Sequence, residues 1–336
     1  MVKLVGNSNL KGAVLAAGLG TRLRPLTDLY PKPLVEVCGR PLIEWGLLAL
    51  AEIGVQHIGV NTHYRGEQLR QHLSPERITS LSRGRAADSL QITWSPEPEL
   101  LGTGGGISQL WSLLVDQTED PSDLICLNGD ALFDFDLLPL LQAHQRDKPR
   151  GTLALRAVPQ GDPFGRVGVD AKGYIVRIAE VCGPRSHEEV RVGAFTGVQI
   201  VTDQVIQHLA PQFSDVFRTA HRALLAADEP ILAHFVEEDS LWVDVGNRER
   251  YLEAHRAVLN KPSSRLWRDL PAPDQSGNVI YENALIGPEI NLGSGVWVGE
   301  RAQIIGRGSL DQSIVWSHTH KALRGEVISR EILTPR

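Results

Sequence analysis

Residues 15–34 read LAAGLGTRLRPLTDLYPKPL, and this stretch decides how the rest of the chain is interpreted. It begins at the end of a short apolar strand, Ala13 to Leu15. Gly18 and Gly20 carry no Cβ, so the backbone there can turn sharply and approach a ligand closely. Backbone N–H groups of such a loop can bind phosphate oxygens, and the guanidinium of Arg22 can bind them bidentately. The stretch therefore predicts a phosphate-binding loop.

Lys32 lies between Pro31 and Pro33 in the same stretch. Proline fixes its own φ and biases the preceding residue toward extended conformations. We therefore expect an extended, stiff segment that confines the Lys32 ammonium near the same phosphates.

Two other kinds of phosphate loop do not fit this stretch. A dinucleotide-binding fingerprint needs a third glycine where this chain has Leu23. The G-x-x-x-x-G-K-[ST] pattern is absent. A simple tight turn with a solvated arginine would not require the rest of the stretch, from Thr21 to Leu34.

The stretch resembles the motif of the nucleotidyltransferases that join a nucleoside triphosphate to a sugar 1-phosphate, G-x-G-T-R-x-x-P-L-T-x-x-x-P-K-P-L. Every fixed position matches: Gly18, Gly20, Thr21, Arg22, Pro25, Leu26, Thr27, Pro31, Lys32, Pro33 and Leu34. The resemblance extends more weakly to about residue 260. It implies that Arg22 and Lys32 are catalytic, and that the nucleotide contacts Leu15, Ala16, Ala17, Gly18, Gly20, Thr21 and Arg22.

Composition limits the class of protein. The chain has 336 residues, which suggests about two domains. A net charge of −6 gives no basic surface for nucleic acid. The three cysteines have no metal-binding spacing, which suits a reducing cytosol. No apolar run is long enough to span a membrane. We therefore expect a cytoplasmic enzyme without nucleic-acid or membrane partners.

Strand and helix patterns alternate over the first 130 residues. Helices are expected at 41–53 and 65–73, and strands at 57–61, 91–94 and 124–128. This alternation predicts an α/β fold with a mostly parallel mixed sheet. The resemblance implies that it is a Rossmann-like nucleotidyltransferase domain, over residues 1–262. Ligands of such sheets bind outside the carboxyl ends of the strands, where the motif loop and Asp130 both fall. A strand-rich region at 151–201 is expected to bind the acceptor.

The C-terminal part of the chain carries a repeat. Residues 263–277 are rich in proline and serine and are expected to form a linker. Apolar residues then recur every six positions, at Ile280, Ile286, Leu292, Val298, Ile304, Leu310 and Trp316. The pattern resembles the left-handed parallel β-helix of hexapeptide-repeat proteins, here in about two coils over residues 278–336. Because such a short stack leaves edges exposed, we expect a homo-oligomer, a dimer or larger.

Two acidic residues end apolar strands, Asp130 in the sequence NGD and Asp244 in WVDVG. An aspartate at a strand end is more often a turn or cap residue. Both positions, however, match the family's metal-binding acids. Mg²⁺ is usually held by one or two carboxylates together with substrate phosphates. The resemblance therefore implies that Asp130 and Asp244 are catalytic and bind Mg²⁺.

A second glycine-rich segment, LGTGGG at 101–106, can be read as a flexible helix entry or as a nucleotide-binding loop. The resemblance implies that Gly102, Thr103, Gly104 and Glu97 contact the base and ribose. Glu97 could accept both N1–H and N2–H of guanine, which favours GTP. The AAG sequence and triple glycine resemble the N-acetylmuramic acid 1-phosphate uridylyltransferases, which favours UTP. We expect UTP, with a GTP-using mannose-1-phosphate guanylyltransferase as the alternative.

The acceptor side matches the family less faithfully. The resemblance implies that Gly165, Glu180, Phe195 and Thr196 bind the sugar. The family often has E-K-P at Glu180, and its lysine binds the sugar phosphate; here Val181 follows instead. Either Arg166 or Arg185 supplies the missing charge, or both are solvated surface residues; the sequence favours neither alternative.

The expected reaction converts an NTP and a sugar 1-phosphate, the two substrate partners, into an NDP-sugar and pyrophosphate. The acceptor phosphate attacks the α-phosphorus in line, and positioning and charge neutralisation supply the catalysis. A rival interpretation is a non-catalytic regulatory homologue that binds sugar nucleotides. It would be favoured by loss of Arg22, Lys32, Asp130 or Asp244, and all four are present.

Overall fold

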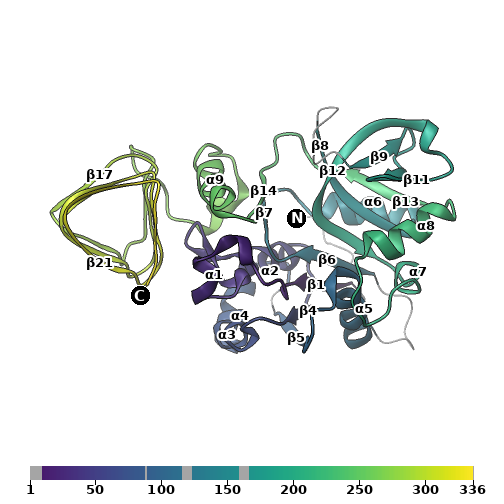
Figure 1. Ribbon diagram of the computed structural model, residues 1–336, viewed down its shortest axis with the longest axis horizontal. Helices are drawn as coiled ribbons and strands as arrows, with labels where there is room; N and C mark the ends of the chain where they lie inside the picture. The colour runs from purple at the N-terminus through teal and green to yellow at the C-terminus, as the bar shows by residue number, and fades with distance from the viewer. Residues whose placement is uncertain (1–9, 88, 116–122, 159–165, 336) are drawn as a thin grey trace.

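The computed structural model describes residues 10–87, 89–115, 123–158 and 166–335 (Figure 1). Its largest sheet has a parallel half in which the strands lie in the order β6, β1, β4, β5. These strands are β1 Lys11–Leu15, β4 His57–Thr62, β5 Gln91–Pro96 and β6 Leu124–Asn128. Strands β1, β4 and β6 are mostly buried, as expected for parallel strands covered by helices on both faces, whereas the edge strand β5 is only partly buried.

The other half of the sheet is mainly antiparallel. Its strands are β8 Gly151–Ala157, β9 Val167–Asp170, β10 Ile175–Ile178, β11 Val181–Cys182, β12 Glu189–Val201 and β13 Ile231–Phe235. The long strand β12 pairs antiparallel with β6, β8 and β9, whereas β13 pairs parallel with β8. The α/β class is therefore confirmed, but the mostly parallel arrangement holds only for the first half. The carboxyl ends of β1, β6, β8 and β13 lie at one edge of the sheet.

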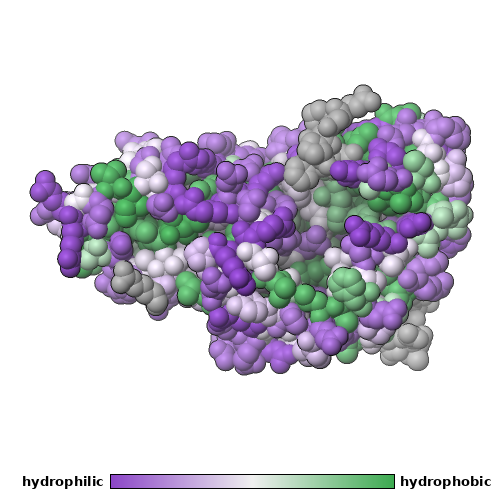
Figure 2. Space-filling view, viewed as in Figure 1, coloured by the Kyte–Doolittle hydropathy of each residue, from purple (hydrophilic) through white to green (hydrophobic). Residues whose placement is uncertain are grey.

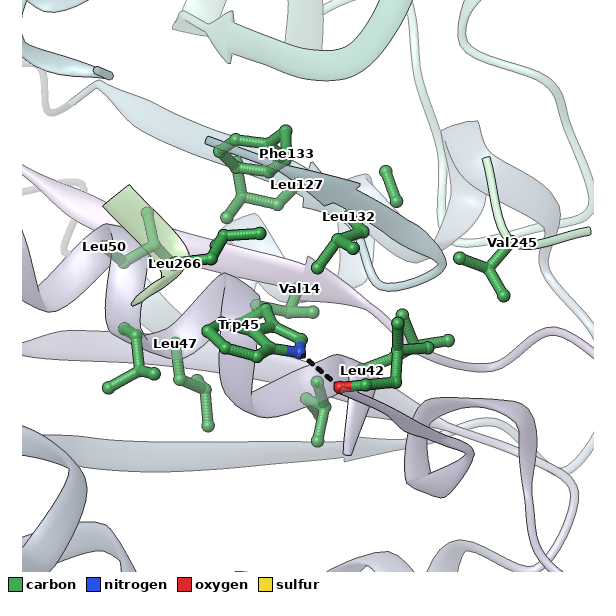
Figure 3. Close-up of a cluster of buried hydrophobic side chains, with 14 of the residues drawn as sticks. Val14, Leu42, Trp45, Leu47, Leu50, Leu127, Leu132, Phe133, Val245 and Leu266 are labelled. Atoms are coloured by element: carbon green, nitrogen blue, oxygen red, sulfur yellow. Dashed lines mark hydrogen bonds between the residues drawn. The ribbon is translucent and has the colours of Figure 1, made fainter. Parts of the chain in front are cut away.

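Helices cover the sheet, and α2 (Leu42–Glu52) is the most deeply buried of the long helices among the described residues. Pro41 precedes it with extended backbone, and Gly54 follows it with a φ of +85°. Figure 3 shows Trp45 and Leu47 of α2 packed near Val14 of β1, with the Trp45 Nε1 donating to the Val37 carbonyl. Each such fully buried side chain stabilises the fold by about 1.5–3 kcal/mol.

The other elements of this domain are shorter or peripheral. The helices are α1 Leu26–Leu29, α3 Gly66–His72, α4 Pro75–Ser82, α5 Gly102–Leu114, α6 Leu138–Asp147, α7 Asp203–Ile206, α8 Arg222–Ala226 and α9 Arg248–Leu259. Single turns and a π-helical segment occur at η1 Thr21–Leu23, η2 Lys32–Leu34, η3 Ser186–Glu188 and η4 Phe217–His221. Two small ribbons pair β2 Glu36–Val37 with β3 Arg40–Pro41, and β7 Ala131–Phe133 with β14 Trp242–Asp244.

The expected linker, 263–277, is packed against the α/β domain. It contains the turn η5 (Arg265–Asp269), whose Leu266 reaches the core cluster drawn in Figure 3. The guanidinium of Arg85 lies 2.7 Å from the Asp269 carboxylate. These contacts fix the path of the segment, while the domain boundaries at 262 and 277 stay a prediction.

After this segment the chain forms a stack of parallel strands with a three-sided outline, which we call the C-terminal stack (residues 278–333; Figure 1). One side pairs Val279 with Trp297, Trp297 with Ile314 and Ile314 with Ile332, at intervals of 18, 17 and 18 residues. The described residues thus hold three coil steps, more than the two expected. The strands are β15 Val279–Ile280, β16 Leu285–Ile286, β17 Glu289–Leu292, β18 Trp297–Val298, β19 Gln303–Asp311, β20 Ile314–Val315, β21 His320–Ser329 and β22 Ile332–Leu333.

The six-residue repeat is confirmed up to Leu310 and fails at Trp316. The apolar positions from Ile280 to Leu310 all belong to the interior cluster of the stack. The coil between Trp297 and Ile314 is one residue shorter, and a one-residue shift exchanges the faces of a strand. Val315 therefore points inside the stack, and Trp316 packs against the α/β domain instead.

The surface agrees with a stack that has open ends. Figure 2 looks onto one end of it, where hydrophobic residues lie within a hydrophilic rim. Through the described ranges, the helices are too short or too polar for a membrane span. Whether a second copy covers the stack stays a prediction.

A buried ionic cluster ties α2 to α4. The Glu44 carboxylate, with none of its surface exposed, accepts hydrogen bonds from Arg40, His72 and Arg77 at 2.6–2.9 Å. Burial alone would raise its pKa, but the hydrogen bonds from His72 and Arg77 and the charges of Arg77 and Arg40 lower it to about 2. A depressed carboxyl pKa means that the ionised group stabilises the native state above its unfolded pKa.

Glu44→Gln should lower the free energy of unfolding at pH 7 by about 3 kcal/mol, because it leaves buried cations unpaired. This difference from wild type should shrink as pH falls from about 4.5 toward 2, where the native carboxyl also becomes protonated. Urea unfolding across this range measures it. Glu67 on α3 is exposed, so the control Glu67→Gln should change the free energy of unfolding little. A pH-independent difference for Glu44→Gln would contradict the assignment.

Candidate active site

A cavity of about 300 Å³ opens at the carboxyl ends of β1 and β6. It brings together these sequence-predicted residues: Leu15, Ala16, Ala17, Gly18, Lys32, Glu97, Gly102, Thr103 and Asp130. The motif loop and Asp130 thus share one crevice, as the strand pattern predicted.

Gly20 does not line the cavity but allows the loop to close on it. Its φ is +65°, and a Cβ there would lie 2.9 Å from both the Lys32 Cβ and the Thr27 Cγ2. The Thr27 hydroxyl donates to the Gly20 carbonyl at 2.9 Å. A side chain at position 20 would therefore be strained and would displace Lys32.

Lys32 has a different backbone from the one expected. It begins the 3-10 turn η2, so the prediction of an extended segment was wrong; only Pro31 is extended. Proline's φ suits the first turn of a helix as well as extended chain, and Pro33 continues the turn. The Lys32 side chain is 9% exposed, and its Nζ lies 2.6 Å from Asp130 Oδ2. This ion pair holds the ammonium at the cavity wall.

Asp130 and Asp244 come together through the β7–β14 ribbon. That pairing places Asp244 opposite Ala131, and the Val245 N–H donates to the Asp130 carbonyl at 3.0 Å. Burial and the negative charge of Asp130 raise the pKa of Asp244, and the charges of Lys32 and Arg22 partly offset this. Two carboxylates that repel each other are a suitable donor set for a hard dication.

A metal bound by Asp130 and Asp244 would take its other ligands from substrate or water. Within the described ranges, no group of three or more His, Cys, Asp or Glu side chains is placed to hold a metal. A pair of carboxylates leaves ligand positions for water and phosphate, which is how Mg²⁺ is usually bound. Mg²⁺ at Asp130 and Asp244 therefore stays a prediction with which the geometry is compatible.

Arg22 and Thr21 lie in the exposed turn η1, beside rather than inside the cavity. The Nη2 of Arg22 lies 3.4 Å from where a Cβ of Gly246 would be, which places its guanidinium near the residues after Asp244. Arg22 thus lies on the side of the crevice that carries Asp244.

Glu97 is 3% exposed and held in a fixed orientation. Its Oε1 accepts from Asn61 Nδ2 at 2.7 Å, and its Oε2 accepts from the Leu101 N–H at 2.9 Å. Asn61 in turn accepts the Ala16 N–H through Oδ1, at 2.6 Å. Sequence analysis missed Asn61, although a polar residue in the apolar strand β4 was a usable signal. Each carboxylate oxygen of Glu97 keeps a lone pair for a ligand.

The triple glycine has a packing role. Gly104, Gly105 and Gly106 lie in the first turns of α5 rather than in a loop, and none of the three lines the cavity. A Cβ on Gly105 would lie 2.2 Å from the Gln212 carbonyl, and one on Gly104 would lie 2.5 Å from Ser214 Oγ. These glycines let the 212–214 segment cross the helix, which places Phe213, with 78% of its surface exposed, at the cavity.

The predicted sugar-binding residues do not meet at this cavity. Glu180 is exposed and paired with Arg166 at 2.7 Å. Phe195 packs edge-on against Phe217, and the fully buried Thr196 donates to the Ala154 carbonyl. Gly165 lies outside the described residues. The other candidate cation, Arg185, is bound by Asp170 and Asp228.

A second cavity, of about 260 Å³, lies at the carboxyl ends of β8 and β13. Arg156, Glu237, Glu238, Ser240 and Trp242 line it. The Arg156 guanidinium lies 5.1 Å from the centre of the Trp242 ring, and its buried Nε has no hydrogen-bond partner within the described part of the chain.

Trp242 lines this second cavity and lies on the same strand as Asp244. It lies two residues before Asp244 on β14, so both side chains project from the same face of the strand. Sequence analysis missed Arg156 and Trp242. The alternation in Trp242-Val243-Asp244 was the available signal for the tryptophan.

Comparisons with known proteins identify the family of this chain. Residues 11–261 match the family described as "Nucleotidyl transferase". The mannose-1-phosphate guanyltransferase 2 of Candida glabrata is 30% identical over 83% of this chain and 72% of its own length. The mannose-1-phosphate guanylyltransferase of Mycobacterium tuberculosis is 29% identical over 90% and 79%. A solved UDP-glucose pyrophosphorylase complexed with UDP-glucose shares the fold, with a TM-score of 0.59 and 19% identity over 75% of this chain and 99% of its own. The chain therefore belongs to the nucleotidyl transferase family, and the transferase expected from its motif loop is confirmed.

Proposed function

We propose that this enzyme is a sugar-1-phosphate nucleotidyltransferase that uses GTP, with mannose 1-phosphate as the acceptor. The observation that carries the transfer chemistry is the meeting of the glycine loop, Lys32 and Asp130 in one cavity, with Asp244 beside them. These groups bind phosphates and neutralise their charge, and neither task needs a protein nucleophile.

The proposed mechanism is a direct displacement. A phosphate oxygen of the acceptor attacks the α-phosphorus, and the bond to the β-phosphate bridging oxygen breaks as pyrophosphate leaves. Lys32 stabilises charge at the α-phosphate, because its ammonium is fixed at the cavity wall. Arg22 and the Gly18–Thr21 backbone hold the leaving phosphates. Asp130 and Asp244 would hold Mg²⁺, which would supply positive charge to the phosphates of both substrates.

Three observations support guanine rather than uracil as the base of the triphosphate. The triple glycine favoured UTP in the sequence, but Gly104 and Gly105 accommodate the 212–214 segment rather than a base. Glu97 lines the cavity and can accept two N–H groups of guanine. The similar proteins from Candida glabrata and Mycobacterium tuberculosis are named for guanylyl transfer. We therefore propose GTP, and UTP becomes the alternative.

The acceptor is proposed to occupy the second cavity. Arg156 supplies the cation that the missing family lysine would have provided, and it has an unused N–H donor. Glu237, Glu238 and Ser240 offer acceptors and a donor for sugar hydroxyls. Trp242 places this site on the same strand face as Asp244.

Three further expectations remain proposals. The C-terminal stack is a left-handed β-helix, as its triangular outline and coils of 17 or 18 residues suggest. Its open ends are covered in a homo-oligomer, and the enzyme works in the cytoplasm.

Pyrophosphate release from a panel of triphosphates and sugar 1-phosphates tests the function and the base together. We expect kcat/KM for GTP to exceed that for UTP by at least about tenfold, because a buried carboxylate facing uracil carbonyls is unpaired. Glu97→Gln should reduce this ratio, whereas the exposed neighbour Glu99→Gln should not. No release with any pair would support the non-catalytic alternative, and a preference for UTP would overturn the base assignment.

Asp130→Asn and Asp244→Asn should each raise the Mg²⁺ concentration needed for half-maximal activity. A nucleotide–Mg²⁺ crystal structure provides an independent check. An ion more than about 5 Å from both carboxylates would lie beyond even a water-bridged contact and would rule out this site.

Asp244→Asn should also raise the melting temperature of the metal-free enzyme at pH 7. The pKa of Asp244 is raised above 3.8, so its charged form destabilises the native state, and this penalty disappears below the unfolded pKa. The gain should therefore vanish below about pH 3.8 and fall as Mg²⁺ is added. Asp134→Asn is the contrasting control: Asp134 accepts from Leu241 and Lys261, so this change should lower the melting temperature.

Arg156→Ala should raise KM for the sugar 1-phosphate by about 10- to 100-fold, the value of a lost charged hydrogen bond. KM for the triphosphate should stay within about twofold, since Arg156 does not line the first cavity. Arg166→Ala and Arg185→Ala are controls, because acids already bind both guanidinium groups. An unchanged acceptor KM would place the acceptor elsewhere.

A further inference from the structure

We infer that the C-terminal stack positions Lys32, and that Trp316 is the positioning residue through which it acts. This inference concerns the proposed nucleotidyl transfer and rests on Lys32 having its proposed part in it. The segment that carries Lys32, Tyr30 to Gly39, lies between the α/β core and the stack, beside α9; Figure 1 shows α1 and α9 on the side of the domain that faces the stack.

Trp316 reaches this segment in two ways. Its Nε1 donates to Tyr251 Oη at 2.7 Å, and that hydroxyl donates to the Glu36 carbonyl at 2.7 Å. Its ring also lies 5.5 Å from the ring of Tyr30, centre to centre. One side chain thus contacts the segment two residues before Lys32 and, through Tyr251, four residues after it.

Other residues of the stack hold the same segment. The Ser317 N–H donates to Glu36 Oε2 at 3.0 Å, and the Tyr281 hydroxyl donates to the Cys38 carbonyl at 3.3 Å. Tyr281 also packs so closely that a Cβ on Gly39 would lie 2.5 Å from its ring. Glu36 and Cys38 are therefore fixed from outside their own domain.

The segment has room to move if this support is removed. Lys32 lies in a turn with backbone hydrogen bonds from Leu34 to Pro31 and from Val35 to Lys32. A cavity of about 500 Å³ opens beside it, and Tyr30, Leu34, Glu36 and Trp316 are among its lining residues. Without the indole the turn can relax into this space. A shift of about 1 Å at a catalytic group is enough to cost a large factor in rate.

Trp297 provides a matched control at the same interface. It is 2% exposed, as is Trp316, and its ring stacks on Trp267 at 6.1 Å. Its Nε1, however, has no hydrogen-bond partner among the described residues. A tryptophan-to-phenylalanine change at position 316 removes an N–H that donates a hydrogen bond, whereas the same change at position 297 removes an N–H with no partner among the described residues.

The experiment compares Trp316→Phe and Trp297→Phe, alone and in a Lys32→Ala background, at a temperature where all variants are folded. We expect Trp316→Phe to lower kcat about tenfold with KM for the triphosphate within about twofold, and Trp297→Phe to stay within about twofold in both. In the Lys32→Ala background, Trp316→Phe should have no further effect on kcat, since both act through one group. An unchanged kcat, or an equal loss in both backgrounds, would overturn the inference.

Amide hydrogen exchange over residues 30–39 separates this inference from the proposed function. It should be faster in Trp316→Phe than in Trp297→Phe, whether or not the enzyme releases pyrophosphate. Equal exchange in the two variants would contradict the positioning role. Failure of wild type to release pyrophosphate would instead contradict the proposed function, and the exchange data would still decide how the segment is held.

Discussion

The contact between Lys32 and Asp130 is the constraint on which the site depends. An ammonium with 9% of its side chain exposed is held 2.6 Å from a carboxylate at the end of a central strand. Burying a charge in this way is costly unless it is paired, so the two segments that carry the pair must be placed accurately. Gly20 is required because any Cβ there would meet Lys32, and Gly129 is required because a Cβ would lie 2.8 Å from the Leu15 carbonyl.

Segments that are distant in the sequence surround the Lys32–Asp130 ion pair. Asp130 follows β6, and its neighbour Ala131 pairs with Asp244 across more than a hundred residues. On the other side, the Lys32 turn is supported by α9 and the C-terminal stack through Tyr251 and Trp316. The central sheet and the β7–β14 ribbon thus place the two carboxylates, and the stack holds residues on both sides of Lys32. Such preorganisation matters because fixed charges need no rearrangement when the reaction occurs.

Sequence predicted the parts of this arrangement that depend on local pattern. The apolar runs of β1, β4 and β6 and the caps of α2 identified the α/β fold, and the loop from Gly18 to Lys32 pointed to residues that line the first cavity. It did not predict the turn at Lys32, since proline permits both extended and helical φ. It also placed Trp316 inside the repeat, because one missing residue in a coil cannot be seen without the strand register.

The proposed acceptor site was the part least predictable from the sequence. Thr196 matched a family position, yet its hydroxyl is buried and bonded to Ala154. Arg156 matched none, but the pairing of β8 with β13 and the ring of Trp242 place it in a cavity. Such a role cannot be read from spacing alone, because residues 156, on β8 of the large sheet, and 242, on the β7–β14 ribbon, become neighbours only in the folded protein.

The rate of pyrophosphate release by Lys32→Ala tests the central claim most directly. Lys261→Ala, which breaks a second Lys–Asp pair outside the cavity, controls for loss of an ion pair. We expect Lys32→Ala to lose about 2–4 kcal/mol of transition-state stabilisation in kcat while it remains folded, and Lys261→Ala to keep its kcat. A Lys32→Ala enzyme with kcat within about twofold of wild type would contradict the claim that this fixed ammonium drives the transfer.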